Sequence, residues 1–540
     1  MAATLHRLGL SHVFGVVGSG NYVVTNELVR RGATYVPARH ETGAGMMADA
    51  YARVSGEMTA LSLHQGCGLT NALTSIVEAS KSRTPMLVLT GDTPPTVQTS
   101  NFWVDQEAVL VALGVEVHRV HSAATAVLDT VRAFRRARDA RHTVVLNLPL
   151  DVQDEPLDLD ESAALPLDFT LTTAGATDEG AELVAQVLRE ARRPVVVGGR
   201  GALQARSELE VLAQSAGALL STSAVARGLF EGDPWYVDVM GGFATPAAAE
   251  LIAGADALVA FGASLNRWTS RSGDLLKDKV VVVVDADADA IGFHHGPDHA
   301  VVGDSATVAA AAAKLLGQRP DEGYRTAEVR ARLEREGRWR QVPYEDTGTE
   351  THIDPRTLSI ALDDLLPKQR VVVPDGGNFN GYPAMFLAVP DARGFVLPLA
   401  FQSIGLSLGA AIGAALALPD RVAVAGVGDG GLMMSLTELD TAVRLRLPLV
   451  VLVYNDDAYG AEVHHFADDH EALGTVVFPD TDIAAIARGF GCEAVTVRST
   501  HDLGPVREWV DGPRERPLLI DAKITSFPSW VLAHTFQGEK

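Results

Sequence analysis

Two short polar motifs constrain this chain most, because each directly follows a run of apolar residues. The β-rich run Arg421 to Val427 leads into Gly428-Asp429-Gly430-Gly431, and the apolar run Leu449 to Tyr454 ends at Asn455-Asp456-Asp457. The stretch between them, 432–447, is predicted to be helical. A right-handed strand–helix–strand crossover places both motifs at one edge of a parallel sheet. We therefore expect two carboxylates and an amide to meet there, beside a glycine turn whose N–H groups can approach phosphate oxygens.

This combination suits a divalent cation that holds a diphosphate, because Mg²⁺ prefers oxygen ligands and keeps substrate phosphates among them. The segment Gly426-x-Gly428-x-x-Gly431 also matches the dinucleotide-binding fingerprint. Asp429 argues against that interpretation, since an unpaired carboxylate would repel a pyrophosphate unless a metal lay between them. An NAD site would also need an acidic residue about 20 residues further on, at a strand end. Glu438 and Asp440 come too early and lie in the predicted helix; a solvated Asp429 in a tight turn remains an alternative.

The chain resembles the thiamine diphosphate enzymes of the acetolactate synthase and benzoylformate decarboxylase family. The two motifs above are similar to the family's GDG and NN. RHETGAG at 39–45, continuing to AYAR at 50–53, is similar to the stretch with the glutamate that activates thiamine. GCGLTN at 66–71 resembles the family's GPGATN. The motifs follow one another in the family's order along nearly all of the 540 residues, so the chain is identified as a member.

Predicted strands alternate with predicted helices throughout, which is typical of doubly wound parallel sheets in an α/β protein. The chain is also longer than a single hydrophobic core usually supports. The resemblance implies three such domains: a pyrimidine-binding domain at 1–155, a central domain at 180–317 and a diphosphate-binding domain at 352–540. The acidic stretch Asp151 to Glu179 is predicted to be a linker, and the charged stretch Gln318 to Glu350 a second connection with one exposed helix.

The composition argues against several classes of partner. The chain has 68 acidic and 45 basic residues and a net charge of −23, with no long basic run, so neither nucleic acid nor an anionic membrane is an expected partner. Cys67 and Cys492 fall in different predicted domains, and no signal-peptide pattern is present, so we expect a cytoplasmic protein without a disulfide framework. The uncharged stretch Leu399 to Leu418 could span a bilayer by length, but its glycines, serines and glutamine favour a buried helix.

The resemblance assigns four catalytic residues. It implies that Glu41 contacts the aminopyrimidine ring of thiamine and assists its activation by proton transfer. Ser19 and His64 resemble a substrate-binding serine and the catalytic histidine of benzoylformate decarboxylase. Gln106 matches an active-site glutamine of acetolactate synthases. From the residues alone, Glu41 could equally be a first-turn acid favoured by the helix dipole, and His64 a histidine bonded within its turn.

The resemblance also assigns the cofactor and metal sites. The implied Mg²⁺ ligands are the side chains of Asp429 and Asp456 and the carbonyl of Ala458. Position 456 is more commonly Asn in the family, and Mg²⁺ accepts the additional carboxylate readily. Ile404 aligns with the apolar residue that bends thiamine diphosphate, although a core isoleucine is the alternative. The other residues expected at the cofactor are Gly377, Asn378, Gly428, Gly430, Gly431, Asn455, Tyr459 and Gly460.

FAD is a further question, because some family members bind it in the central domain. Gly198-Gly199-Arg200-Gly201 is compatible with such a site. The family's GAR motif, however, is Gly262-Ala263-Ser264 here and lacks the arginine suited to the FAD pyrophosphate. The sequence therefore does not favour obligatory FAD.

We predict a thiamine diphosphate- and Mg²⁺-dependent enzyme that acts on a small 2-oxo acid. The favoured reaction is decarboxylation followed by carboligation, as in acetolactate synthase, and the alternative is a simple decarboxylase of the benzoylformate decarboxylase type. An NAD-binding dehydrogenase lacks its acidic residue, and a non-catalytic homologue would be expected to lose Glu41 or Asp429. In the family, Glu41 and the diphosphate loop come from facing subunits, which implies a homodimer or homotetramer.

Overall fold

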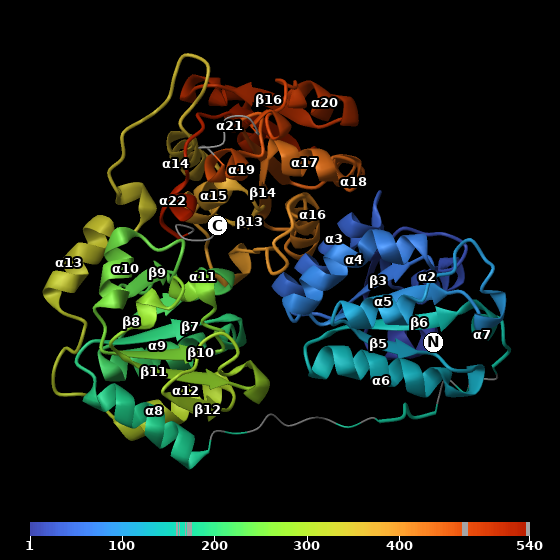
Figure 1. The fold of residues 1–540 in the computed structure, drawn as a ribbon, viewed down its shortest axis with the longest axis horizontal. Coiled ribbons are helices and arrows are strands. Elements are labelled where there is room, and N and C mark those ends of the chain that lie inside the picture. The colour runs from blue at the N-terminus through green and yellow to red at the C-terminus, as the bar shows by residue number, and fades with distance from the viewer. Residues whose placement is uncertain are drawn as a thin grey trace.

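Three parallel sheets organise the chain, as the alternating pattern predicted, and helices cover the faces of each sheet (Figure 1). The structure, a computed structural model, describes residues 1–157, 160, 163–167, 169, 175, 177–466 and 473–535. Part of the predicted linker between Asp151 and Glu179 therefore lies outside the described residues.

The first sheet has six strands in the order β2-β1-β3-β4-β6-β5. Its strands are β1 (His12–Gly15), β2 (Thr34–Pro37), β3 (Thr59–Leu63), β4 (Met86–Asp92), β5 (Glu116–Arg119) and β6 (Thr143–Pro149). Its helices are α1 (Ala2–Arg7), α2 (Tyr22–Arg30), α3 (Glu41–Ser55), α4 (Cys67–Lys81), α5 (Gln106–Ala112), α6 (Ala126–Asp139) and α7 (Leu150–Gln153). The central strands β3, β4 and β6 are buried along their whole length, as a sheet covered on both faces requires.

The second sheet also has six strands, in the order β12-β11-β10-β7-β8-β9. Its strands are β7 (Pro194–Gly198), β8 (Leu219–Thr222), β9 (Tyr236–Val239), β10 (Ala257–Phe261), β11 (Val280–Asp285) and β12 (His299–Val302). Its helices are α8 (Asp178–Glu190), α9 (Arg206–Ala216), α10 (Pro246–Ala253), α11 (Arg267–Ser270) and α12 (Ser305–Leu316), and α13 (Ala327–Glu336) lies in the charged connection that follows.

The third sheet has five strands in the order β13-β14-β15-β17-β16. Its strands are β13 (Arg370–Pro374), β14 (Val422–Gly428), β15 (Leu449–Asn455), β16 (Glu493–Val497) and β17 (Leu518–Lys523). Its helices are α14 (Pro355–Leu365), α15 (Gly381–Phe386), α16 (Ser407–Ala417), α17 (Asp429–Ser435), α18 (Glu438–Arg444), α19 (Gly460–His465), α20 (Ile483–Phe490), α21 (Gly504–Asp511) and α22 (Trp530–Thr535). The single helix predicted over 432–447 is thus interrupted at Leu436 and Thr437, which keep right-handed helical dihedral angles.

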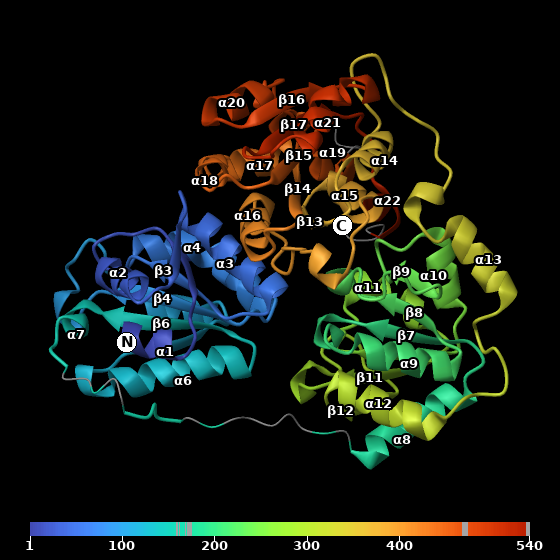
Figure 2. The same ribbon diagram turned by 180° about the vertical axis from the view of Figure 1, so that it is seen from behind.

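The first and third domains meet through α3 and α16, which lie side by side in both views (Figures 1 and 2). A Cβ atom added to Gly413 would lie 2.1 Å from the carbonyl oxygen of Met47, so the two helix backbones are in direct contact. Buried helix α16 falls within the uncharged stretch Leu399 to Leu418, as predicted. In the part of the chain that the structure describes, no helix has both the length and the apolarity needed to cross a bilayer.

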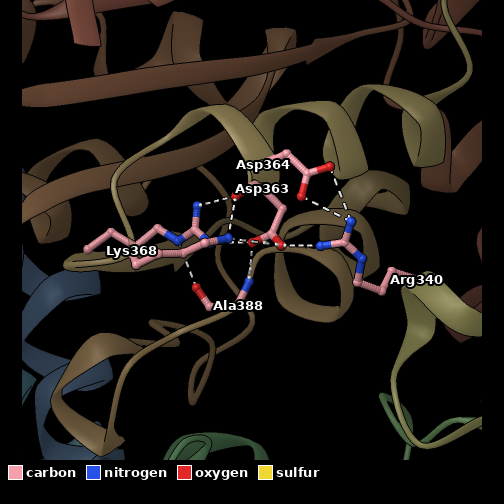
Figure 3. Close-up of polar contacts among 6 residues, drawn as sticks. Arg340, Asp363, Asp364, Lys368 and Ala388 are labelled. Atoms are coloured by element: carbon pink, nitrogen blue, oxygen red, sulfur yellow. Dashed lines mark hydrogen bonds and ion pairs between the residues drawn. The ribbon is translucent and has the colours of Figure 1, made fainter. Parts of the chain in front are cut away.

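A buried ion pair lies at the amino-terminal end of strand β13 in the third sheet (Figure 3). The guanidinium of Arg370, the first residue of β13, contacts the carboxylate of Asp363 in α14, and both side chains are almost completely buried. Asp363 also accepts from Ala388 N at 2.8 Å and from Arg340 Nη1 at 3.1 Å. Arg340 belongs to the charged connection, whose neighbouring Trp339 donates from Nε1 to the Phe243 carbonyl of the central domain. The connection is therefore bonded to both domains that it joins.

We expect Asp363→Asn to destabilise the third domain, because it leaves the Arg370 guanidinium buried without its charge partner. Breaking a buried pair in this way costs about 3–5 kcal/mol, which lowers the midpoint of thermal unfolding by roughly 10 °C. Asp364→Asn is the matched control, since Asp364 pairs with the same Arg340 but its side chain is 59% exposed, and exposed pairs contribute about 0–1 kcal/mol. Calorimetry measures the midpoint of thermal unfolding of both variants, and equal midpoints would contradict the prediction.

Candidate active site

The two polar motifs lie at the carboxyl ends of neighbouring strands. Strands β14 and β15 pair in parallel, with Gly428 opposite Tyr454 in the register. Asp429 is the first residue of α17 directly after β14, and Asp456 follows Asn455 at the end of β15. The crossover places both carboxylates at the same edge of the sheet, as predicted from the sequence.

Asp429 is buried and incompletely bonded, and Asp456 is half-buried. Asp429 is 7% exposed, and its Oδ1 atom is buried without a hydrogen-bond partner among the described residues. Burial, and to a smaller extent the negative charge of Asp456, raise the pKa of Asp429 to about 7. Burial also raises the pKa of Asp456 to about 6, although Ser526 Oγ donates to its Oδ2 at 3.3 Å. An uncompensated carboxylate pair of this kind fits a divalent cation, which would neutralise both charges.

Protein side chains alone would not complete a cation's coordination shell. Within the described ranges, no group of three or more His, Cys, Asp or Glu side chains is arranged to hold a metal. A cation at Asp429 and Asp456 would take its other ligands from main-chain carbonyls, such as that of Ala458, and from phosphate oxygens. Mg²⁺ sites commonly have this composition, with one or two carboxylates and the phosphates of the ligand.

Two glycines permit the close packing around these carboxylates. A Cβ atom on Gly430 would lie 2.4 Å from Cε1 of Tyr459, and one on Gly460 would lie 2.3 Å from Oδ2 of Asp456. Any larger residue at either position would therefore displace the Tyr459 ring or the Asp456 carboxylate. Tyr459 in turn contacts Phe478 edge to face, with ring centroids 4.9 Å apart.

Asn455 connects the loop that follows β15 to strand β17 through its side-chain hydrogen bonds. Its side chain is 1% exposed; Nδ2 donates to Asp521 Oδ1 at 2.8 Å, and Oδ1 accepts from Asp457 N at 3.0 Å. Lys523 is buried in the same region, and its Nζ contacts Asp480 at 2.5 Å and Asp457 at 3.4 Å. The Asn455 amide therefore fixes the loop conformation rather than projecting toward a ligand.

The loop after β13 lies at the same edge. Asp375 is fully buried; its Oδ2 accepts from Gly405 N at 2.7 Å, and burial raises its pKa to about 6. Gly431 packs on this carboxylate, because a Cβ atom there would lie 2.7 Å from Asp375 Oδ2. Ile404, half-buried, packs against Gly376, where an added Cβ would lie 3.0 Å from Ile404 Cγ2. Asp375 thus holds the segment that carries Ile404, a role that the sequence alone did not indicate.

Gly377 and Asn378 follow on the same loop. Gly377 adopts a φ of +131°, a conformation that favours glycine. Asn378 uses its amide within the domain, since Nδ2 donates to the Phe527 carbonyl at 2.8 Å and Oδ1 accepts from Ser529 N at 2.8 Å. Its side chain therefore anchors the C-terminal segment beside the site.

Glu41 begins α3, as predicted, and is bonded to the third sequence motif. Nδ2 of Asn71 in α4 donates to Glu41 Oε2 at 3.1 Å. A Cβ atom on Gly68 would lie 3.6 Å from Glu41 Oε1, so the glycine turn also borders this carboxylate. Asn71 closes the GCGLTN motif, and its contact with Glu41 explains why the two motifs belong together.

Ser19 and His64 face each other across the ends of β1 and β3. Oγ of Ser19 lies 3.3 Å from His64 Nε2, and His64 Nδ1 lies 2.8 Å from the Gln65 carbonyl oxygen. A carbonyl only accepts hydrogen bonds, so Nδ1 carries a proton, and in the neutral ring Nε2 is the acceptor. The edge of the Phe102 ring packs on the imidazole at 4.9 Å. The geometry leaves Nε2 and the serine hydroxyl as a polar pair at the carboxyl edge of the first sheet.

Gln106 lies in the interior instead of at this edge. It is 2% exposed, and Oε1 accepts from Gly66 N at 2.8 Å while Nε2 donates to the Gly91 carbonyl and to Asn147 Oδ1, each at 3.1 Å. Both amide protons are used within the domain. Gln106 therefore fixes the turn at Gly66, and both of its amide N–H groups are bonded within the first domain.

The glycine loops of the central domain bond to each other. Gly199 N donates to the Phe261 carbonyl at 2.8 Å, and Gly201 N donates to the Gly262 carbonyl at 3.1 Å. These loops follow β7 and β10, which flank the point where the strand order reverses and where ligands of doubly wound sheets usually bind. Two N–H groups that could receive a pyrophosphate are thus already used.

Comparison with known families covers all three domains. Residues 1–110 match the family described as thiamine pyrophosphate enzyme, N-terminal TPP binding domain. Residues 181–312 match the central domain of the same enzymes, and residues 375–522 match their C-terminal TPP binding domain.

Curated relatives are similar over almost the whole chain. A sulfoacetaldehyde acetyltransferase of Castellaniella defragrans is 29% identical over 534 residues, which cover 93% of this chain and 88% of the relative. A probable 2-ketoarginine decarboxylase of Pseudomonas aeruginosa is 30% identical over 528 residues, covering 92% and 88%. The acetolactate synthase large subunit of Parasynechococcus marenigrum is 28% identical over 512 residues, covering 91% and 82%.

We expect Asp429→Asn to stabilise the cofactor-free protein at pH 8 while weakening its binding of metal and diphosphate. Folding raises the pKa of Asp429 to about 7, so the ionised carboxylate opposes folding. This opposition grows as the pH rises from about 4, the ordinary value for Asp, to about 7, and stays constant above. The midpoint of thermal unfolding should therefore increase by a few degrees at pH 8 and change little at pH 4.

Asp456→Asn is the comparator, because Asn supplies an oxygen ligand and should retain the cofactor. Thermal unfolding of the cofactor-free proteins and titration with thiamine diphosphate and Mg²⁺ separate the two effects. An Asp429→Asn variant no more stable than the wild type at pH 8 would contradict an uncompensated charge at this position.

Proposed function

The chain belongs to the thiamine diphosphate-dependent enzymes that act on oxo acids or aldehydes, and from this premise we propose a decarboxylating transferase. In this proposal, the enzyme uses thiamine diphosphate and Mg²⁺ to remove CO₂ from a 2-oxo acid and joins the remaining fragment to a second carbonyl compound. The alternative that the site also supports is a simple 2-oxo acid decarboxylase.

The carboxylate pair at the third sheet carries the cofactor part of the proposal. Asp429 Oδ1 is a buried acceptor without a partner among the described residues, and Asp456 lies on the neighbouring loop. With Mg²⁺ between these carboxylates and the diphosphate, both charges would be compensated. The glycine turn from Gly428 and the Tyr459-Gly460 segment would border the phosphates.

The proton-transfer step of the proposal rests on Glu41. Bound thiamine diphosphate supplies the carbon nucleophile that attacks the keto group of the substrate. The Glu41 carboxylate, oriented by Asn71, would hold and release a proton at the aminopyrimidine ring. Ile404 would orient the cofactor by packing against it.

Substrate binding in the proposal rests on Ser19 and His64. With Nδ1 protonated and bonded to the Gln65 carbonyl, Nε2 can take up a proton, and the Ser19 hydroxyl can donate to a carboxylate. The pair would therefore orient the substrate's carboxylate and move a proton during product formation.

The names of the relatives support the transfer reaction, while the Ser19–His64 pair supports the alternative. Sulfoacetaldehyde acetyltransferase and acetolactate synthase are named for transfer or joining of carbon fragments, whereas 2-ketoarginine decarboxylase is named for decarboxylation. Gln106, the residue expected from acetolactate synthases, is buried in the first domain. A His64–Ser19 pair able to supply a proton is what a decarboxylase needs to release an aldehyde.

Two facing copies of the chain would complete the site. Within the described residues of one chain, no hydrogen bond joins Glu41 to the Asp429 or Asp456 loops. Large apolar side chains border both halves and are about half exposed: Met433, Met434, Phe102 and Trp103. Exposed apolar clusters of this kind often mark subunit interfaces, so we propose a homodimer or a dimer of dimers.

A panel of 2-oxo acids, assayed with and without aldehyde acceptors, tests the reaction. CO₂ release that requires an acceptor and yields a joined product indicates transfer; acceptor-independent release with formation of an aldehyde indicates simple decarboxylation. On the substrate so identified, His64→Ala should lower kcat by about 10²–10⁴-fold, because a proton-transfer group is lost, and leave the Kd of thiamine diphosphate unchanged. Unaltered kinetics with a lower unfolding temperature would instead make His64 a structural residue.

A mixed dimer tests where Glu41 acts. Glu41→Gln alone should fold and bind the cofactor but lose about 10²–10⁴-fold in turnover, and Asp429→Ala alone should not retain the cofactor. In a purified heterodimer of these two variants, one site is intact if Glu41 serves the facing subunit, so about half of the wild-type activity should return. If Glu41 serves its own chain, both sites are defective and the heterodimer stays inactive, which would contradict the proposed arrangement.

A further inference from the structure

The turn that leads into Glu41 is held by a carboxylate of the third domain. Glu438, the first residue of α18, is 1% exposed, although it lies far from Glu41 in the sequence. Its Oε1 accepts from His40 N at 2.9 Å and from Arg39 N at 3.2 Å. These two N–H groups belong to the residues that directly precede Glu41.

The Glu438 carboxylate fits closely against the start of α3. A Cβ atom on Gly43 would lie 2.4 Å from Glu438 Oε1, so only glycine leaves room for the carboxylate at this point. On its other side, Thr441 Oγ1 donates to Oε2 at 2.7 Å. Both carboxylate oxygens of Glu438 are therefore bonded.

The surrounding contacts fix the same turn less directly. Arg39 Nε pairs with Asp440 at 2.6 Å, and Arg444 Nη2 donates to the Pro37 carbonyl at 2.7 Å, both at the surface. His40 is the N-cap of α3, since its Nδ1 accepts from Thr42 N at 3.1 Å. Of these contacts, only the Glu438 carboxylate is buried and binds the backbone immediately before Glu41.

We propose that Glu438 is a positioning residue that sets the orientation of Glu41. The inference rests on the proposed function, in which Glu41 moves a proton at the cofactor. By binding two successive peptide N–H groups, Glu438 fixes the peptide planes that begin α3 and thus the direction in which the Glu41 side chain leaves the helix. Small errors in the placement of a reacting group have large effects on rate.

A graded set of variants separates this role from general stability. Glu438→Gln keeps one acceptor oxygen for His40 N and can place its amide toward Thr441 Oγ1, so it should preserve most of the contact. Glu438→Ala removes both acceptors. Asp440→Asn is the matched control, because it weakens the exposed contact with Arg39 on the same helix and leaves the Arg39 and His40 N–H groups bonded.

The first measurement needs neither cofactor nor substrate. Hydrogen–deuterium exchange of the cofactor-free protein, read by mass spectrometry, reports the peptide that covers residues 34–45. Glu438→Ala should speed exchange at the start of α3 by about tenfold or more, Glu438→Gln by much less, and Asp440→Asn not at all. Unchanged exchange in Glu438→Ala would overturn the proposal. Should the Ala variant fail to fold, the comparison of Glu438→Gln with Asp440→Asn decides.

The second measurement tests the link to Glu41. In the loaded enzyme, Glu438→Ala should lower kcat about 10–100-fold while KM and the Kd of thiamine diphosphate change less than threefold, and Glu438→Gln should restore most of the rate. Faster exchange with an unchanged kcat would overturn the positioning role. If Glu41→Gln itself proved fully active, the proposed function would fail, and the exchange experiment would still show whether Glu438 holds the turn.

Discussion

The third domain brings several carboxylates close together at the carboxyl ends of β14 and β15, and their charges must be compensated. Asp457 and Asp480 are compensated within the protein, because the ammonium group of Lys523 contacts both. Asp429 follows β14 and Asp456 follows β15, so the two lie on neighbouring loops, and the charge of Asp456 adds to the cost of burying Asp429. Lys523 thus compensates Asp457 and Asp480, whereas Asp429 and Asp456 have no cationic side chain as a partner within the described residues. In the proposed function, a divalent cation would compensate them.

A second constraint is the close contact between the first and third domains. Gly409 packs on Gly43 and Gly413 on Met47, so the backbones of α16 and α3 touch without intervening side chains. Helices approach this closely only where small residues line the contact. The same contact brings α18 to the start of α3, and with it the bonds that Glu438 makes to the turn before Glu41. The start of α3, which carries Glu41, is therefore joined to the third domain of the same chain by helix packing and by the bonds of Glu438.

The sequence was sufficient for the features that depend on local pattern. Parallel strands that end in polar motifs predicted the shared sheet edge, and the helix beginning at Glu41 and the buried helix α16 were also predicted correctly. Strand β5 was not predicted, because its residues Glu116 to Arg119 are only half-buried and lack an apolar run. The hydrogen bonds of Gln106 could not be predicted either, since its partners Gly66, Gly91 and Asn147 converge only in the folded domain. The contacts of Glu438 could not be predicted for the same reason: its partners come from another domain, and no spacing in the sequence connects them.

The aspartate at position 456 would change the charge that the proposed site presents to a cation. An asparagine there would offer only the dipole of its amide, whereas the aspartate adds a full charge close to Asp457 and Asp429. Its pKa of about 6, and that of about 7 for Asp429, mean that both carboxylates carry protons in mildly acidic solution when no cation is present. Cation binding must displace those protons, so its affinity depends on pH. Near neutral pH, the additional charge of Asp456 would strengthen the attraction to a cation. At lower pH, protons would compete with the cation for the two carboxylates. In the proposed holoenzyme, the aspartate would therefore make retention of the diphosphate depend on pH more steeply than an asparagine would.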